Sequence, residues 1–430
     1  MPKKYIHYDR YYLRIELLQR KKECKLIYIP KYWIEESSSK RIRSFVDNLL
    51  QDHNNKILSN FKDEIFDKIF DLYSTLTSKP NIFYYPEEEQ DYNRVLDIFV
   101  RTNAGGTKLS YSDLLFSKIK LKWDKAREEF LSLKEEINEN DTFDFDIDFI
   151  LKTCLVIFSK KSQDVRYKIE NFKDSKIGEI KDNWNNIVKS IQITKDILVG
   201  KIGDENIRVK HKKLLPSHNA IIPIIYYIYK RDIRGIGNFP KGVSEEEINK
   251  IRKWLYQVLL SGVFSGQSDN VLYKAKETLD EVQSDGFPAI HLIKAIKSIK
   301  SFDLSEEFLE KIKYNSTNSY LILSMIYSDL NFKPNFNGNL PQQDHIFSVN
   351  ELKGKYKRQD IDNIGNIRFV SAAENNWKKS TPFNVWIKTI SDEEKEKHLI
   401  PKGEWNIENY KEFLQGRREL IFNKIKDILR

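Results

Sequence analysis

The sequence places a carboxylate, an imidazole and several side-chain amides close together near its C-terminal end. Asp344 and His345 are adjacent, Asn366 follows a glycine, and Asn375 and Asn376 stand side by side further along the chain. Carboxylate and amide oxygens are hard ligands that suit Mg²⁺. A neutral imidazole beside such an ion can take a proton from water. Together, these groups predict a site that hydrolyses phosphodiester bonds.

Each group has an expected role in that chemistry. Asp344 would bind the metal ion, and Asn376 would complete its protein ligands. His345 would deprotonate the attacking water through one ring nitrogen, while the other nitrogen donates to the side-chain oxygen of Asn366. The ion would then stabilise charge on the scissile phosphate and on the leaving oxygen.

Two strands and a helix must position these residues. Residues 344–347 have the pattern of a short strand, 364–367 that of a second strand, and 375–379 that of a helix start. Successive side chains on a strand point to opposite faces. Asp344 and His345 are therefore expected at a strand end, where the chain has left the pleat and both side chains can reach one small cavity.

Basic residues lie beside the predicted site. Four of them occur in the loop between the two strands and two in the helix: Lys353, Lys355, Lys357, Arg358, Lys378 and Lys379. A basic loop next to the base would hold a DNA backbone without reading its sequence. The whole chain has 72 Lys+Arg against 63 Asp+Glu, a formal net charge of +9, which permits a polyanionic partner.

These three segments resemble the HNH (ββα-metal) nuclease fold in its Asp-His, Gly-Asn and Asn-x-x-Lys-Ser form, the last piece of which begins at Asn376. The resemblance implies that His345 is the general base and that Asn366 orients it. It also implies that Asp344 and Asn376 bind Mg²⁺ or Mn²⁺. Asn375 is an adjacent alternative to Asn376 as a ligand.

A second segment, residues 99–110, is similar to a signature of GmrSD-type modification-dependent restriction endonucleases. In that family a ParB-like nucleotide-hydrolysing domain, a helical region and a C-terminal HNH domain are joined. Arg101, Asn103, Gly105 and Gly106 are candidates for binding a nucleotide or phosphate, because glycines before a helix N-terminus leave backbone N–H groups for an anion. The alternative interpretation is a tight turn into a capped helix.

The sequence also departs from that family. Its Asp-Gly-Gln-Gln-Arg motif for nucleotide hydrolysis is absent, and residues 1–95 look like the later part of the ParB-like domain. We therefore expect either an N-terminally truncated form or a companion protein that carries the missing half. Autonomous nucleotide hydrolysis is not expected.

The hydrophobic pattern predicts a mainly α fold with small β elements. The two resemblances imply a partial ParB-like domain at 1–125 and an HNH nuclease domain at 316–430, and the helical pattern between them indicates a scaffold at 126–315. Within these ranges the hydrophobic pattern predicts a strand at 24–30 and a C-terminal helix at 404–430. The two cysteines exclude a disulfide framework, and no cysteine that could bind zinc follows Cys154. No apolar run reaches the roughly 18 residues of a membrane span, so a cytoplasmic protein is expected.

The predicted function is a metal-dependent DNA endonuclease of a restriction or phage-defence system, acting on double-stranded DNA with or without modified bases. One alternative is a non-catalytic DNA-binding or partner-binding subunit of such a system. Another is a nucleotide hydrolase. The sequence leaves open RNA as a substrate, nicking against double-strand cleavage, the modification recognised and the oligomeric state.

Overall fold

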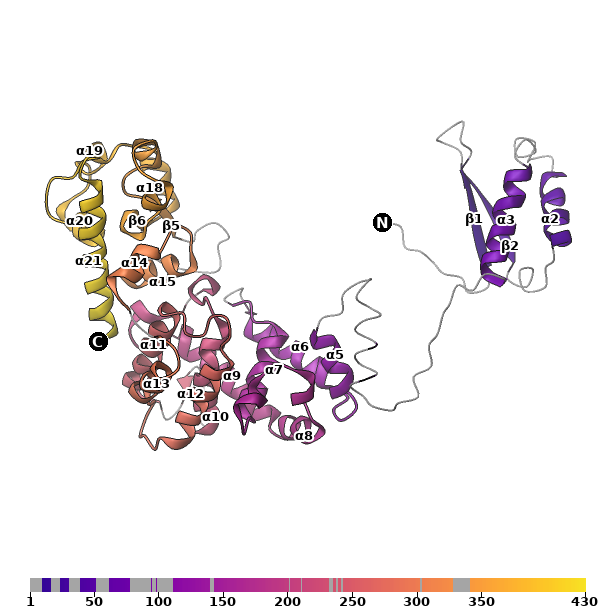
Figure 1. Cartoon of the computed structure of the whole chain (residues 1–430), viewed down its shortest axis with the longest axis horizontal. Helices are drawn as coiled ribbons and strands as arrows, with labels where there is room; N and C mark the ends of the chain where they lie inside the picture. Colours follow the sequence, from indigo (N-terminus) through magenta and orange to yellow (C-terminus); the bar gives the residue numbers. More distant parts are fainter. Residues whose placement is uncertain are drawn as a thin grey trace. The chain divides into compact units, whose positions relative to one another are not determined.

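The structure is a computed structural model, and most of the chain is described by it. The described residues are 10–16, 24–30, 39–51, 62–77, 94, 98, 111–139, 143–200, 202–209, 211–231, 235–236, 239–240, 243–301, 304–327 and 341–430. They are mainly helical and form three two-stranded sheets, in agreement with the predicted class (Figure 1). The chain divides into two compact units, residues 1–95 and 96–430.

The first unit contains two paired strands and two helices. These are β1 (Arg10–Glu16), β2 (Cys24–Pro30), α2 (Ser39–Gln51) and α3 (Lys62–Thr77). The strands are antiparallel, which confirms the strand predicted at 24–30. The helices contact each other and bury apolar side chains from both, Ile42 and Val46 on α2 and Ile65 and Ile69 on α3. The candidate phosphate-binding residues Arg101, Asn103, Gly105 and Gly106 lie outside the described residues.

The second unit begins with a helical region. Its elements are α5 (Tyr111–Ile119), α6 (Ala126–Ile137), α7 (Ile147–Ile157), α8 (Asp174–Asp182), α9 (Trp184–Val199), α10 (Ile222–Lys230), β3 (Gly235–Ile236), β4 (Phe239–Pro240), α11 (Glu245–Leu260), α12 (Asp269–Glu281), α13 (Ala289–Lys297), α14 (Glu306–Lys311) and α15 (Thr317–Ile326). Helix α5 belongs here, because Phe116 packs edge-on against Phe130 of α6. Helices α5 and α6 therefore lie in the same compact unit.

The C-terminal part of the second unit carries the candidate site. It contains β5 (Gln342–His345), α16 (Val349–Leu352), α17 (Arg358–Ile361), the 3₁₀ turn η8 (Ile364–Asn366), β6 (Ile367–Val370), α18 (Ala372–Lys378), α19 (Phe383–Trp386), α20 (Asp392–Lys397) and α21 (Tyr410–Leu429). Ile364, Phe369 and Ile421 share one apolar core with the helical region, and both regions belong to the second compact unit. A smaller core around Phe347 and Phe413 lies within this part.

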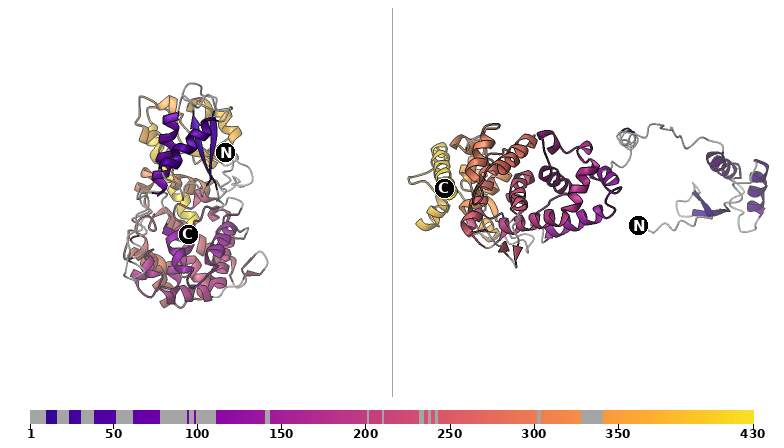
Figure 2. Two further views of the ribbon diagram at one scale, coloured as in Figure 1. Left: turned by 90° about the vertical axis from the view of Figure 1, so that its right-hand side faces the viewer. Right: turned by 90° about the horizontal axis from the view of Figure 1, so that it is seen from below.

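Helix α21 holds in place the residues that directly precede β6 in the sequence. It runs along one side of the C-terminal part, in yellow in Figures 1 and 2, and contacts η8, α14 and α15. Its buried Arg417 donates to the carbonyl oxygens of Ile364 and Gly365, each at 3.0 Å. A Cβ at Gly365 would lie 2.9 Å from the carbonyl oxygen of Leu414, so only glycine lets α21 come this close.

The C-terminal helix starts later than the pattern predicts. α21 begins at Tyr410, whereas we expected a helix from residue 404. The side chains of Asn406 and Asn409 accept hydrogen bonds from nearby backbone N–H groups, which stabilises a turn instead of a first helical turn.

Among the described residues, no helix combines the length and the apolar character that crossing a bilayer requires.

Candidate active site

The residues predicted to act together lie on two short antiparallel strands and the helix that follows them. β5 pairs with β6 so that Asp344 stands opposite Arg368 and His345 opposite Ile367. Helix α18 then packs against β5. Its N-terminus is capped by Ser371, whose hydroxyl accepts from the backbone N–H of Glu374. The order strand, loop, strand, helix occurs, but the predicted bounds are wrong: β5 ends at His345, residues 364–366 form a 3₁₀ turn before β6, and 375–378 is the end of α18 and not its start.

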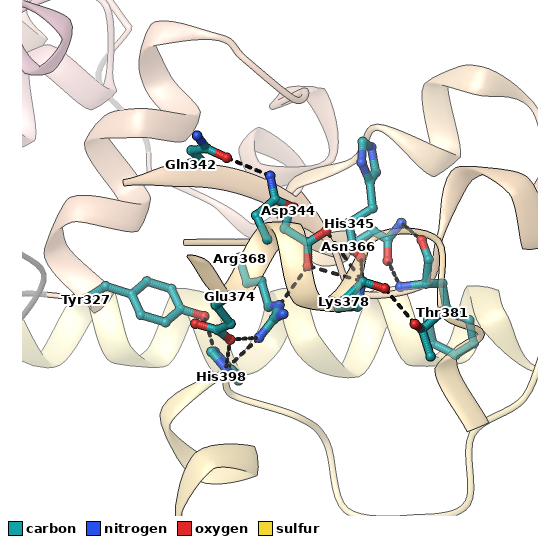
Figure 3. A network of polar contacts seen from close by, with 12 residues as sticks. Tyr327, Gln342, Asp344, His345, Asn366, Arg368, Glu374, Lys378, Thr381 and His398 are labelled. Carbon is teal, nitrogen blue, oxygen red and sulfur yellow. Dashed lines mark hydrogen bonds and ion pairs between the residues drawn. The ribbon is translucent and has the colours of Figure 1, made fainter. Parts of the chain in front are cut away.

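The two adjacent side chains Asp344 and His345 do not enter one cavity. His345 is the last residue of β5, and successive side chains of a strand point to opposite faces. Asp344 points toward α18 and lies beside Arg368 and Lys378, whereas the His345 ring points away from this group (Figure 3). The expectation that a strand end would bring both side chains to one place is corrected by this geometry.

We call the first environment the outer face, made by His345, Asp362, Tyr314 and Arg358. The Nε2 atom of His345 lies 2.9 Å from Oδ1 of Asp362, and the imidazole stacks on the Tyr314 ring with centroids 4.8 Å apart. Asp362 also accepts from Nε of Arg358 at 2.6 Å. The His345 side chain is 12% exposed, and burial lowers its pKa, although hydrogen bonding to Asp362 opposes that shift. The ring is therefore neutral at pH 7 and able to accept a proton.

The tautomer of His345 follows from its partner. A carboxylate can only accept, so Nε2 carries the proton and donates it to Asp362. Nδ1 then keeps its lone pair, and no partner for this atom is found in the described part of the chain. The outer face thus offers an oriented, neutral base of the kind that general base catalysis requires.

Asn366 does not orient His345 as predicted. Its side chain is fully buried, accepts from the backbone N–H of Phe347 at 2.8 Å, and donates to the carbonyl oxygens of Phe347 and Ile361. It thereby ties the chain after β5 to the loop before β6. The predicted partner of the base is replaced by Asp362, because the amide of Asn366 is used up by backbone groups.

We call the second environment the inner face, made by Asp344, Arg368, Lys378, Glu374 and His398. Oδ2 of Asp344 lies 3.0 Å from Nε of Arg368 and 3.1 Å from Nζ of Lys378. Arg368 also donates to Glu374 at 2.7 Å and to Nε2 of His398 at 2.8 Å. Figure 3 shows this chain of polar contacts continuing to Tyr327.

The cationic side chains of the inner face are buried as well as paired with carboxylates. The side chains of Arg368 and Lys378 are fully buried, and the ring of Trp386 lies 4.4 Å from the guanidinium carbon of Arg368. Arginine can only donate, so Nε2 of His398 has no proton and the ring is neutral. Burial and the neighbouring Arg368 and Arg417 lower the pKa of His398 to about 3.

The predicted DNA-binding residues divide into exposed and buried ones. The four side chains of the loop between the strands, Lys353, Lys355, Lys357 and Arg358, are exposed, and so is Lys379. Lys378 is buried against Asp344, so its predicted contact with DNA is corrected. The two residues have different environments because α18 ends at Lys378 and Lys379 adopts a left-handed backbone with φ 46°.

The donor atoms on the inner face do not fit a divalent ion in their present arrangement. Both oxygens of Asp344 are approached by cationic groups, Oδ1 by Lys378 and Oδ2 by Lys378 and Arg368. Asn376 is exposed, and Asn375 donates to the side chain of Gln342 at 2.7 Å. Across the residues that the structure describes, no group of three His, Cys, Asp or Glu could hold a metal.

Sequence reasoning missed several residues of both faces. Asp362 and Arg358 are four residues apart on one short helical turn, a spacing that could have suggested an ion pair. Tyr314 gave no signal, because its position depends on a contact with a distant segment: its backbone N–H donates to the carbonyl oxygen of Asp362 at 2.7 Å.

No protein-family model matches this chain, and no curated protein matches its sequence.

Proposed function

We propose that this chain is a DNA endonuclease of a restriction or phage-defence system, in which His345 is the general base. The observation that carries the proposal is the pair of His345 and Asp362. It combines a largely buried, neutral imidazole with a carboxylate at 2.9 Å, at the end of a strand whose following loop exposes a run of basic side chains. The HNH and GmrSD resemblances support the same reaction class.

The proposed reaction uses the tautomer set by Asp362. Nδ1 of His345 takes a proton from water as the water oxygen attacks phosphorus, and the bond from phosphorus to the leaving oxygen breaks. Asp362 stabilises the imidazolium that forms. Arg358, whose side chain is 63% exposed, lies on the other oxygen of Asp362 and can contact a phosphate oxygen. The leaving oxygen takes a proton from solvent.

A divalent ion, Mg²⁺ or Mn²⁺, when bound would stabilise charge on the phosphate. Asp344 with Asn376, or with Asn375, stays the predicted ligand set. The present contacts of Asp344 with Arg368 and Lys378 do not fit such an ion.

The substrate in this proposal is double-stranded DNA, with or without modified bases, bound through the backbone. The exposed Lys353, Lys355, Lys357, Arg358 and Lys379 support phosphate contacts that do not read sequence. The proposal includes a cytoplasmic location, where invading DNA would be met, and a companion protein that supplies nucleotide hydrolysis.

One observation favours a second candidate, a non-catalytic DNA-binding or partner-binding subunit. The carboxylate of Asp344, which the resemblance assigns to a metal, is neutralised by Arg368 and Lys378. A subunit that has lost cleavage would keep the exposed basic loop and have no use for a free carboxylate.

Plasmid nicking by the purified full chain separates the two candidates. Unmodified plasmid and phage DNA with modified bases are each incubated with wild type, His345→Ala, and His291→Ala as a control at an exposed histidine of α13. Mg²⁺, Mn²⁺ and EDTA are tested in parallel. Cutting that is lost only in His345→Ala supports the endonuclease. DNA binding without cutting by any variant, also in the presence of the companion protein, supports the subunit.

A further inference from the structure

Lys378 holds an unusual position for a lysine at the end of a short helix. Its side chain is fully buried, and its Nζ lies 3.1 Å from Oδ2 and 3.4 Å from Oδ1 of Asp344. The same ammonium donates to the backbone carbonyl of His345. Lysine is rarely this buried unless it is paired, so these contacts to β5 account for its position.

Arg368 and Lys378 are held on Asp344 in different ways. Arg368 has a second carboxylate partner in Glu374, a hydrogen bond to His398 and the face of Trp386. Lys378 has Asp344 and one carbonyl, with the Trp386 ring 5.4 Å from its Nζ. Lys378 is therefore the cation that can leave Asp344 with less loss of contacts.

A divalent ion would need the same carboxylate oxygens. Mg²⁺ binds oxygen at about 2.0–2.1 Å and needs a free lone pair, and an ammonium on that oxygen blocks it both by contact and by like charge. We infer that Lys378 is a built-in cation that takes the place of a divalent ion on Asp344, so that the free protein binds Mg²⁺ or Mn²⁺ there only when Lys378 is removed or displaced.

The inference deepens the proposed function and rests on it for its biological meaning. In an endonuclease, this arrangement keeps the free enzyme without an ion on Asp344. The charge arrangement itself exists whether or not the chain cuts DNA. A test by ion binding is therefore independent of a test by cleavage.

The test is Mn²⁺ binding to the full chain without DNA, followed by the loss of the electron paramagnetic resonance signal of free Mn²⁺. We expect no binding that depends on Asp344 in wild type. Lys378→Met should bind Mn²⁺ about tenfold or more tightly than wild type, because the ammonium no longer competes. The double variant Lys378→Met with Asp344→Asn should lose this gain. Lys379→Met, at the exposed neighbour, should behave as wild type.

Wild-type protein that binds Mn²⁺ as tightly as Lys378→Met would overturn the inference. A Mn²⁺ site in the wild-type protein that disappears in Asp344→Asn would also overturn the inference. This result needs no Lys378 variant, so it decides the matter even if Lys378→Met does not fold. Folding of each variant is checked by circular dichroism. Cutting by wild type in either case bears on the endonuclease proposal alone.

Discussion

The outer and inner faces of the β5–β6 pair differ in how their charges are balanced. On the outer face, one imidazole has one carboxylate partner and an unpartnered Nδ1 among the described residues. On the inner face, Asp344 and Glu374 are shared among buried cations that also contact Trp386 and His398. Adjacent residues of one strand thus have different environments: His345 has a single carboxylate partner, whereas Asp344 is paired with two buried cations.

The largest expected effect comes from breaking the inner face. Asp344→Ala should lower the free energy of unfolding by about 3–5 kcal/mol, because Arg368 and Lys378 would remain buried without their shared carboxylate. Urea unfolding measures this change. Asp392→Ala is the matched control, since its ion pair with Lys395 is at the surface and its loss should change stability far less. Equal effects of the two changes would contradict the difference between the faces.

On the outer face, Asp362→Asn should reduce cleavage about 10- to 100-fold while leaving DNA binding nearly unchanged, because the imidazole loses the group that fixes its tautomer. Asp362 raises the pKa of His345 against the lowering by burial. Its loss should therefore move the acidic limb of the pH–rate profile to lower pH. A limb that stays in place or moves to higher pH would show that Asp362 does not act through His345.

The inner face should also make stability depend on pH. Burial and neighbouring cations lower the pKa of His398 to about 3, so the unfolded chain binds a proton between pH 6.5 and 3 that the folded chain does not. The contribution of His398 leaves the free energy of unfolding unchanged above pH 6.5 and lowers it by about 1.4 kcal/mol per pH unit below that value. Urea unfolding at pH 7 and pH 5 measures the slope. His398→Gln should reduce it, and His291→Gln, on the exposed control residue, should not.

The smallest effect should come from the exposed loop beside the outer face. Lys357→Ala should weaken DNA binding equally on all sequences and reduce the slope of log K against log salt by about 0.9, if one phosphate contact is lost. Lys294→Ala on α13, also exposed, should leave the slope unchanged. Equal slopes for Lys357→Ala and wild type would remove this residue from the DNA contact.

Local features of the fold could be predicted, and long-range partners could not. The strand at 24–30 and the N-cap of α11 at Ser244 follow from a few neighbouring residues. However, the Glu247 carboxylate, which would complete a capping box with Ser244, binds Tyr227 and Arg231 instead. Such a tertiary contact has no signal in the local sequence.

The same division holds at the candidate site. The local sequence predicted two strands followed by a helix, and the structure contains these elements with other bounds: the second strand begins after Asn366, and the helix begins at Ala372. The partners of these residues depend on register and on distant segments. Arg368 is opposite Asp344 only because of the strand pairing, and Tyr314 reaches His345 from before the strand pair. The order of the local elements was therefore predictable from the sequence, but the partners of these side chains were not.

The role of His345 as the general base carries the proposed function. Its most direct test is the single-turnover cleavage rate of His345→Ala beside wild type, on a DNA that wild type cuts, with the melting temperature of both proteins. We expect the rate to fall by about 100-fold or more in a protein that still unfolds cooperatively, with a melting temperature lowered by the loss of the ring's contacts with Tyr314 and Asp362. Cleavage at the wild-type rate by a folded His345→Ala protein would contradict this role.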